Sequence, residues 1–203
     1  MRVGAAAALA AAAVLLAACA SPPPPERRAD AARLMGELMS GRHPIGGPFT
    51  LADPSGRRVA LADFKGKFVL LYFGYATCPD VCPTDLAVIA QALRELGPAA
   101  AGVQPLFVTL DPLRDTAAIL REYTAAFHPG FVALTGSEDE IRHVATDFKV
   151  FYEKVDLPGT NTYAIDHTPY TFLLDRDGKF VILFPPGTPA DRMVEMLREQ
   201  LKL

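Results

Sequence analysis

The chain has 203 residues and is mildly acidic, with 20 Lys and Arg, 23 Asp and Glu, and a formal net charge of −3. This length fits one globular domain with extensions, and the lack of net positive charge argues against a nucleic-acid-binding protein. Half of the residues are hydrophobic, but an alanine-rich N-terminus inflates that figure and overstates the size of the core.

The first 18 residues have the form of an export signal. Arg2 precedes an apolar stretch, Val3 to Ala18, that is too short and too rich in alanine to predict a membrane span. Its end, Leu16 to Cys19, resembles the bacterial lipobox, in which a peptidase cuts before a cysteine that carries lipid. The alternative is an ordinary signal peptide with an incidental cysteine. A lipobox predicts a mature protein that begins at Cys19, is anchored in the bacterial cell envelope, and faces the periplasm or another extracytoplasmic side.

Residues 19–44 are predicted to tether the folded domain to its anchor. Four prolines, Pro22 to Pro25, favour a stiff extended chain, and small and polar residues follow them. The folded domain is therefore expected at residues 45–203.

Strands and helices alternate along this domain. The pattern predicts a hairpin over 49–61, a buried strand over 68–73, a helix over 83–96, a buried strand over 103–110, a helix from 116 to 127, a short strand over 131–134, a capped helix over 137–148, a strand over 150–155, a loop over 158–162, a hairpin over 170–183 and a helix from 188. This order predicts an α/β fold: a thioredoxin-like sandwich with a central mixed sheet flanked by helices and an N-terminal β-hairpin.

Two cysteines lie four residues apart where the first buried strand meets the next helix. Pro83 suits the first turn of a helix, so the helix is predicted to begin at or near Cys82. The thiols of Cys78 and Cys82 then lie at a helix N-terminus, where the helix dipole lowers the pKa of a thiol. Residues four apart share one face of a helical turn, so both sulfurs can converge on one metal ion, although a disulfide also remains possible.

His167 immediately precedes a strand of the predicted C-terminal hairpin. In open α/β sheets reactive groups gather beyond the carboxyl ends of the strands, and in thioredoxin-like folds this loop faces the active turn, often through a cis-proline. We therefore expect His167 beside Cys78 and Cys82, and a cis bond between Thr168 and Pro169. Two thiolates and one imidazole suit copper best and zinc second.

Four further polar residues are candidates to surround such a site. Asp111, Arg114 and Asp115 follow a buried strand and are predicted to form an outer layer around the ligands or a surface for a partner. The structural alternative for Asp115 is a helix N-cap. Asp80, between the cysteines, either tunes the charge at the site or merely faces water.

Several blocks of the sequence resemble the Sco/SenC family. FGYATCPDVCP over 73–83 resembles its metal-binding motif, DPLRD over 111–115 its second block, and DHT over 166–168 its histidine motif. The likeness covers roughly residues 45–202, and the blocks follow the family's order. Thr77 departs from the pattern because many members carry histidine there, and Pro169 resembles thiol oxidoreductases.

The resemblance implies a copper-binding assembly factor that helps to build the CuA centre of cytochrome c oxidase subunit II. Its implied ligands for Cu(I) or Cu(II) are Cys78, Cys82 and His167, and a copper donor protein would supply the metal. Such a factor is not a turnover enzyme. The alternative is a membrane-tethered thiol–disulfide oxidoreductase that uses Cys78 and Cys82 to reduce the cysteines of the oxidase copper site. A structural disulfide or a peroxide-reducing enzyme fits less well, and Tyr75 stands where the peroxidase motif requires threonine.

Overall fold

The computed structural model describes residues 44–202. The predicted export signal, the lipid-bearing Cys19 and the tether therefore lie outside the described residues. The elements in chain order are β1 (Thr50–Ala52), β2 (Arg58–Ala60), η2 (Leu61–Phe64), β3 (Phe68–Gly74), α3 (Val81–Leu96), η3 (Gly97–Gly102), β4 (Val103–Thr109), α4 (Ala117–Phe127), β5 (Val132–Leu134), α5 (Glu138–Asp147), β6 (Tyr152–Asp156), β7 (Tyr163–His167), β8 (Thr171–Leu174), β9 (Phe180–Phe184) and α6 (Ala190–Leu201).

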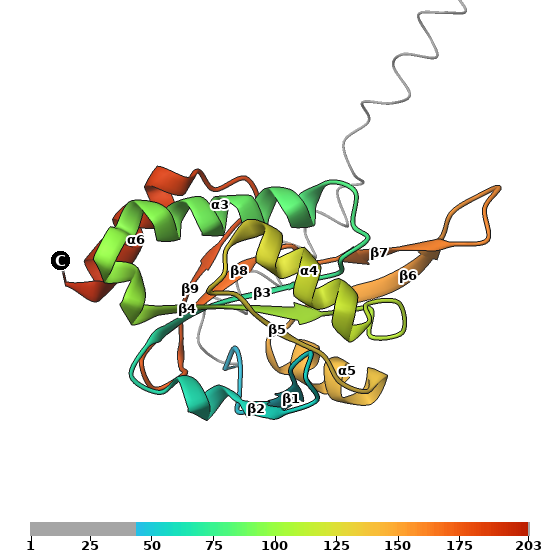
Figure 1. Cartoon of the computed structure of the whole chain (residues 1–203), viewed down its shortest axis with the longest axis horizontal. Helices are drawn as coiled ribbons and strands as arrows, with labels where there is room; N and C mark the ends of the chain where they lie inside the picture. The colour runs from blue at the N-terminus through green and yellow to red at the C-terminus, as the bar shows by residue number, and fades with distance from the viewer. Residues whose placement is uncertain (1–43, 203) are drawn as a thin grey trace, which may run out of the picture. The chain divides into compact units, whose positions relative to one another are not determined.

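A five-stranded mixed sheet forms the centre of the domain, in the order β5-β4-β3-β8-β9 (Figure 1). The central strand β3 runs parallel to β4 and antiparallel to β8. All seven of its residues are buried, as its uninterrupted apolar sequence predicts for a strand covered on both faces. The predicted α/β fold with a central mixed sheet is confirmed.

Helices cover the two faces of this sheet. Figure 1 shows α3 and α6 together on one side, and α5 with the β1–β2 hairpin on the other. On the α5 side the rings of Phe73, Phe148 and Phe172 pack with centroid separations of 5.5–5.9 Å. Because both faces of β3 are packed, the turn that follows it starts from a fixed position.

Local sequence signals account for most of the element boundaries. The N-terminal hairpin is confirmed, with β1 and β2 paired in antiparallel register. Ser137 and Glu140 form the predicted capping box at the start of α5. The helix α3, predicted to begin at or near Cys82, begins at Val81. The last helix, α6, begins at Ala190, two residues later than the sequence indicated.

The two-stranded sheet formed by β6 and β7 was not predicted. The strands β6 and β7 pair from Tyr152 opposite His167 to Asp156 opposite Tyr163. Figure 1 shows this ribbon extending away from the five-stranded sheet. The sequence pointed to a loop over 158–162, which is the hairpin turn, but not to the strand that follows it.

The predicted cis bond between Thr168 and Pro169 is wrong, because every peptide bond in residues 44–202 is trans. Thr168 continues the ladder of the β6–β7 ribbon: its N–H donates to the carbonyl of Phe151 over 2.9 Å. Its hydroxyl accepts a hydrogen bond from the Phe151 N–H over 3.2 Å. These bonds keep the chain extended into β8, and trans is the ordinary state of a peptide bond.

Gly74 ends β3 at a point where the packing leaves no room for a side chain. A Cβ atom at this position would lie 2.9 Å from both the sulfur of Cys82 and Cε1 of Tyr72. We expect Gly74→Ala to lower the free energy of unfolding by about 1–3 kcal/mol, the usual cost of overpacking a core. Urea denaturation of the full-length chain measures this change.

Gly102→Ala is the matched control for that substitution. The nearest atom to a Cβ at Gly102 is Cδ2 of Leu201, at an ordinary contact distance of 3.4 Å. Equal losses of stability in the two variants would show that the glycine at the end of β3 is not sterically required.

Candidate metal centre

The two cysteines lie in the turn between β3 and the first turn of α3. The N–H of Cys78 donates to the carbonyl of Tyr75 over 3.2 Å, which closes the turn after the buried strand. Cys82 is completely buried, whereas Cys78 is 9% exposed at the edge of the turn. Both thiols are free. Cys78 is therefore the more accessible of the pair.

His167 is the last residue of β7 and is 8% exposed. Its Nε2 atom lies 3.4 Å from the sulfur of Cys82, 85 residues away in the chain. The rings of Tyr72 and Tyr75 stand edge-on to the imidazole, with centroids 6.3 and 6.1 Å away. Aromatic packing thus restricts the orientation of the imidazole.

The two thiols have opposite electrostatic environments. The pKa of Cys78 is held well below its usual range because hydrogen bonds stabilise its thiolate. These bonds come from the Cys82 thiol, from His167 and from backbone N–H groups at the start of α3. The Cys78 thiolate and burial raise the pKa of Cys82. One thiolate and one thiol therefore share the turn, and Cys78 is the stronger nucleophile at neutral pH.

The separation of Cys82 and His167 is compatible with two ligands of one metal ion. A tetrahedral ion bound to a thiolate and an imidazole holds the two ligand atoms ~3.5 Å apart. Within residues 44–202, however, no three His, Cys, Asp or Glu side chains are arranged to hold a metal ion as they stand. The side chains of the turn and of the ribbon would have to adjust before three donors could meet at one ion.

Asp115 anchors the cysteine turn from the loop after β4. Its carboxylate accepts hydrogen bonds from the Thr109 hydroxyl over 2.6 Å and from the N–H of Ala76 over 3.0 Å. Asp115 is not the N-cap of α4, because the hydroxyl of Thr116 caps that helix. The N-cap alternative is therefore wrong. Burial raises the pKa of Asp115.

Asp111 and Arg114 hold the other half of the site, the β6–β7 ribbon. The carboxylate of Asp111 is completely buried and accepts hydrogen bonds from Nε of Arg114 and, over 2.8 Å, from the Tyr163 hydroxyl. The Arg114 guanidinium also donates to the Tyr163 carbonyl over 2.7 Å and lies 3.7 Å from the centre of its ring. Tyr163 begins the strand that ends at His167.

Asp80 does not take part in these contacts. It stands at the N-cap position of α3, but its side chain is exposed and makes no capping hydrogen bond. Two residues of the site were not predicted from the sequence: Tyr163, which hydrogen-bonds to Asp111, and Asp85, which is buried one turn after Cys82. Asp85 shares a helix face with Cys82, so the i, i+3 spacing was the available signal.

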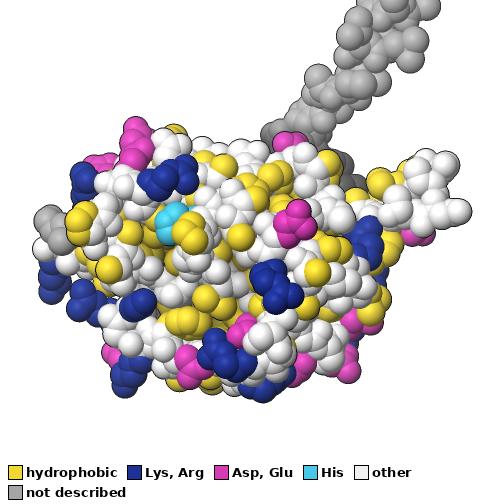
Figure 2. All heavy atoms as spheres, in the orientation of Figure 1, with side chains coloured by type: hydrophobic (Ala, Val, Ile, Leu, Met, Phe, Trp, Pro, Cys, Tyr) yellow, Lys and Arg dark blue, Asp and Glu magenta, His cyan; other side chains and the backbone are white. Residues whose placement is uncertain are grey.

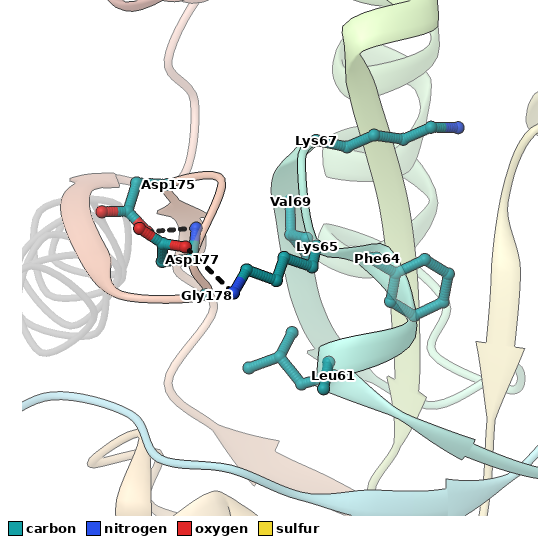
Figure 3. A pocket seen from close by; sticks show the side chains of 9 residues that line it. Leu61, Phe64, Lys65, Lys67, Val69, Asp175, Asp177 and Gly178 are labelled. Atoms are coloured by element: carbon teal, nitrogen blue, oxygen red, sulfur yellow. Dashed lines mark hydrogen bonds and ion pairs between the residues drawn. The ribbon is translucent and has the colours of Figure 1, made fainter.

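The rest of the surface offers no comparable chemistry in the described part of the chain. A pocket of about 180 Å³ lies where β3 begins, at the opposite end of that strand from the cysteines (Figure 3). Lys65 and Asp177 approach to 3.8 Å at its edge. On the face seen in Figure 2, acidic and basic side chains are interspersed, in keeping with the small net charge.

Comparison with known proteins identifies the family. The SCO1/SenC family model matches residues 38–202. A SCO2-like protein of Rickettsia prowazekii is 38% identical over 157 residues, which cover 77% of each chain. The solved structure of Bradyrhizobium japonicum ScoI with copper bound is 40% identical, with a TM-score of 0.71, over 77% of this chain and 99% of that one.

A more distant structure shares the fold. BsSco, described as a member of the Sco family of cytochrome c oxidase assembly proteins with a disulfide switch, is 24% identical, with a TM-score of 0.62, over 80% of this chain and 96% of that one. The family model spans most of the chain, including both cysteines, the loop after β4 and the β6–β7 ribbon. This chain belongs to the SCO1/SenC family.

Proposed function

We propose that this protein binds copper through Cys78, Cys82 and His167 and delivers it during cytochrome c oxidase assembly. The observation that carries the proposal is the 3.4 Å approach of the His167 imidazole to the Cys82 sulfur. Relatives with the same fold are known with copper bound. The family is described as one of cytochrome c oxidase assembly proteins.

The chemistry of the donors supports copper over other metals. Thiolate sulfur is a soft ligand that selects Cu(I), and an imidazole completes a three-ligand set for Cu(I) or Cu(II). The ligands must lose their protons before they bind metal, and the low pKa of Cys78 means that one of them is already deprotonated at neutral pH. Copper is the cargo: a donor protein supplies it, and the CuA centre of oxidase subunit II receives it.

His167 provides the direct test of the ligand set. Loss of a hydrogen bond to a ligand lowers metal affinity by about 10–100-fold. We expect His167→Ala, which removes a ligand itself, to weaken Cu(I) binding by more than that. Anaerobic competition with a chromophoric Cu(I) chelator, using the full-length chain in detergent, measures the affinity. His143→Ala is the control, because the His143 side chain is 76% exposed on α5. Unchanged affinity in His167→Ala would refute the ligand set.

Thiol–disulfide exchange is the second candidate function, favoured by the difference between the two cysteines. An acidic, partly exposed Cys78 beside a buried Cys82 is the arrangement of an attacking and a resolving thiol. Oxidation to a disulfide removes both thiolates from the metal, so copper loading and oxidation exclude each other. If His167→Ala loses copper binding but still catalyses thiol–disulfide exchange, the cysteines serve both in metal binding and in disulfide exchange.

The outer polar residues support the ligands in this proposal. Asp115 fixes the cysteine turn, and Asp111 with Arg114 fixes the ribbon that carries His167. Asp80, which is exposed beside the cysteines, is available to a docking partner. Metal sites depend on such outer contacts because they orient the ligands.

Tyr163→Phe tests this supporting role. The substitution removes the hydrogen bond to Asp111 and keeps the ring against Arg114. We expect Cu(I) affinity to fall about tenfold and amide hydrogen exchange in the β6–β7 ribbon to accelerate. Tyr152→Phe, in the same ribbon, is the control because no described residue hydrogen-bonds to the Tyr152 hydroxyl. An amide hydrogen exchange rate in the ribbon of Tyr163→Phe equal to that of the wild type would show that other contacts hold the ribbon.

The chain is proposed to work at a bacterial membrane. Residues 1–18 form the signal, Cys19 carries the lipid, residues 19–44 form the tether, and residues 45–203 form the copper-binding domain. None of the helices between residues 44 and 202 is both long and apolar enough to span a bilayer. More than one acyl chain on Cys19 makes the attachment stable.

Cys19→Ser tests this attachment. We expect the variant to move from the membrane fraction to the soluble fraction of the cell envelope, because the acyl chains have no other site of attachment in the lipobox. Cell fractionation followed by immunoblotting measures the distribution, with Ser21→Ala as the control. Retention of Cys19→Ser in the membrane at wild-type levels would contradict a lipid anchor at this residue.

A further inference from the structure

A buried tyrosine hydroxyl beside the cysteines has no hydrogen-bond partner. Tyr72, in the central strand β3, is completely buried, and no described residue hydrogen-bonds to its hydroxyl oxygen. A polar group left in this state costs stability, and phenylalanine would fill the same space without that cost. The hydroxyl therefore calls for a functional explanation.

The Tyr72 ring and the Cys82 sulfur meet over Gly74. Tyr72 and Gly74 are two residues apart in β3, so their side-chain positions are on the same face of the sheet. The sulfur of Cys82 and Cε1 of Tyr72 both occupy the space that a side chain at Gly74 would need. Cε1 is bonded to the carbon that carries the hydroxyl. The hydroxyl is thus held in the buried region next to Cys82.

Two further polar atoms in this region also lack partners. Oδ2 of Asp85 and Nδ1 of His167 are buried and have no hydrogen bond among the described residues. Burial raises the pKa of Tyr72, and its neighbours Cys82 and Asp85 raise it further. The Tyr72 hydroxyl therefore keeps its proton and is available as a hydrogen-bond donor beside the Cys82 sulfur.

We propose that Tyr72 is a positioning residue that donates a hydrogen bond from its hydroxyl to the Cys82 sulfur when that sulfur is a metal-bound thiolate. A neutral thiol is only a weak acceptor for this donor. A bound thiolate is a strong acceptor, and a hydrogen bond to a charged group is roughly twice as strong as one between neutral groups.

This hydrogen bond would act on the metal through the sulfur. Hydrogen bonding around a cysteine ligand withdraws electron density from it and tunes the redox potential of a thiolate-bound copper ion. The bond would also favour the deprotonated form of Cys82 that binding requires. This role of Tyr72 rests on the proposed copper site. The Tyr72 hydroxyl would stabilise the protein with copper bound more than the protein without it.

The test is Tyr72→Phe compared with Tyr123→Phe. The Tyr123 hydroxyl is also buried without a partner, and its ring packs 5.5 Å from that of Phe107 in the same core. The two substitutions delete the same atom, but the Tyr72 ring adjoins the Cys82 sulfur over Gly74, whereas the half-buried Tyr123 is affected by the two cysteines only through their charge. Both variants are made in the full-length chain and compared in three measurements.

We expect Tyr72→Phe to lower Cu(I) affinity about tenfold, the usual effect of losing an outer hydrogen bond. We also expect the sulfur-to-Cu(II) charge-transfer band to move to lower energy, because the sulfur becomes a stronger electron donor. The urea midpoint of the metal-free variant should stay the same or rise, since an unpaired polar group is lost. Tyr123→Phe should affect only the urea midpoint.

Unchanged affinity and an unmoved charge-transfer band in Tyr72→Phe would overturn the inference, as would equal losses of affinity in both variants. A lower urea midpoint in metal-free Tyr72→Phe would also overturn it, by showing that the hydroxyl is bonded within the metal-free fold. Each of these results leaves the proposed ligand set intact. Failure of the ligand set is recognised separately, by undiminished copper binding in His167→Ala.

Discussion

The candidate site depends on hydrogen bonds from one loop, residues 111–116, that reach both of its halves. Asp115 binds the turn that carries the cysteines, and Asp111 with Arg114 binds the start of the strand that ends at His167. Cys82 and His167 are 85 residues apart in sequence, so no local preference brings them together. Hydrogen bonds to charged groups contribute about 1.5–3 kcal/mol each, and they add to the ladder of the ribbon in offsetting the entropy of ordering it.

The cost of burying a carboxylate explains why Asp111 in this loop is paired with Arg114 and Tyr163. The Asp111 carboxylate has no exposure to solvent, and burying a carboxylate is costly unless a cation and hydrogen-bond donors contact it. Arg114 and Tyr163 supply both. Burial raises the pKa of Asp85 and Asp115 instead.

Much of this arrangement was predictable from the sequence, because its signals are local. The uninterrupted apolar run of β3, Pro83 in the first turn of a helix, and the capping box at Ser137 each act within a few residues. Tyr163–His167 was missed because its strand pairs only with β6, and its exposed face mixes polar with apolar residues. The role of Asp115 depends on contacts 6 and 39 residues away, which no local pattern reports.

The three proposed ligands differ in how firmly the fold holds them, and this difference suits a protein that must release its metal. Cys82 lies in the first turn of a long helix against the buried strand β3. His167 lies at the end of a two-stranded ribbon whose other end is held through Tyr163, and Cys78 lies in the turn before α3 and is the more accessible of the two cysteines. Elements with few buried contacts open at low free-energy cost. In the proposed transfer, a partner's thiolates would displace Cys78 and His167 while Cys82 still holds the ion, so copper would not have to leave as a free cation.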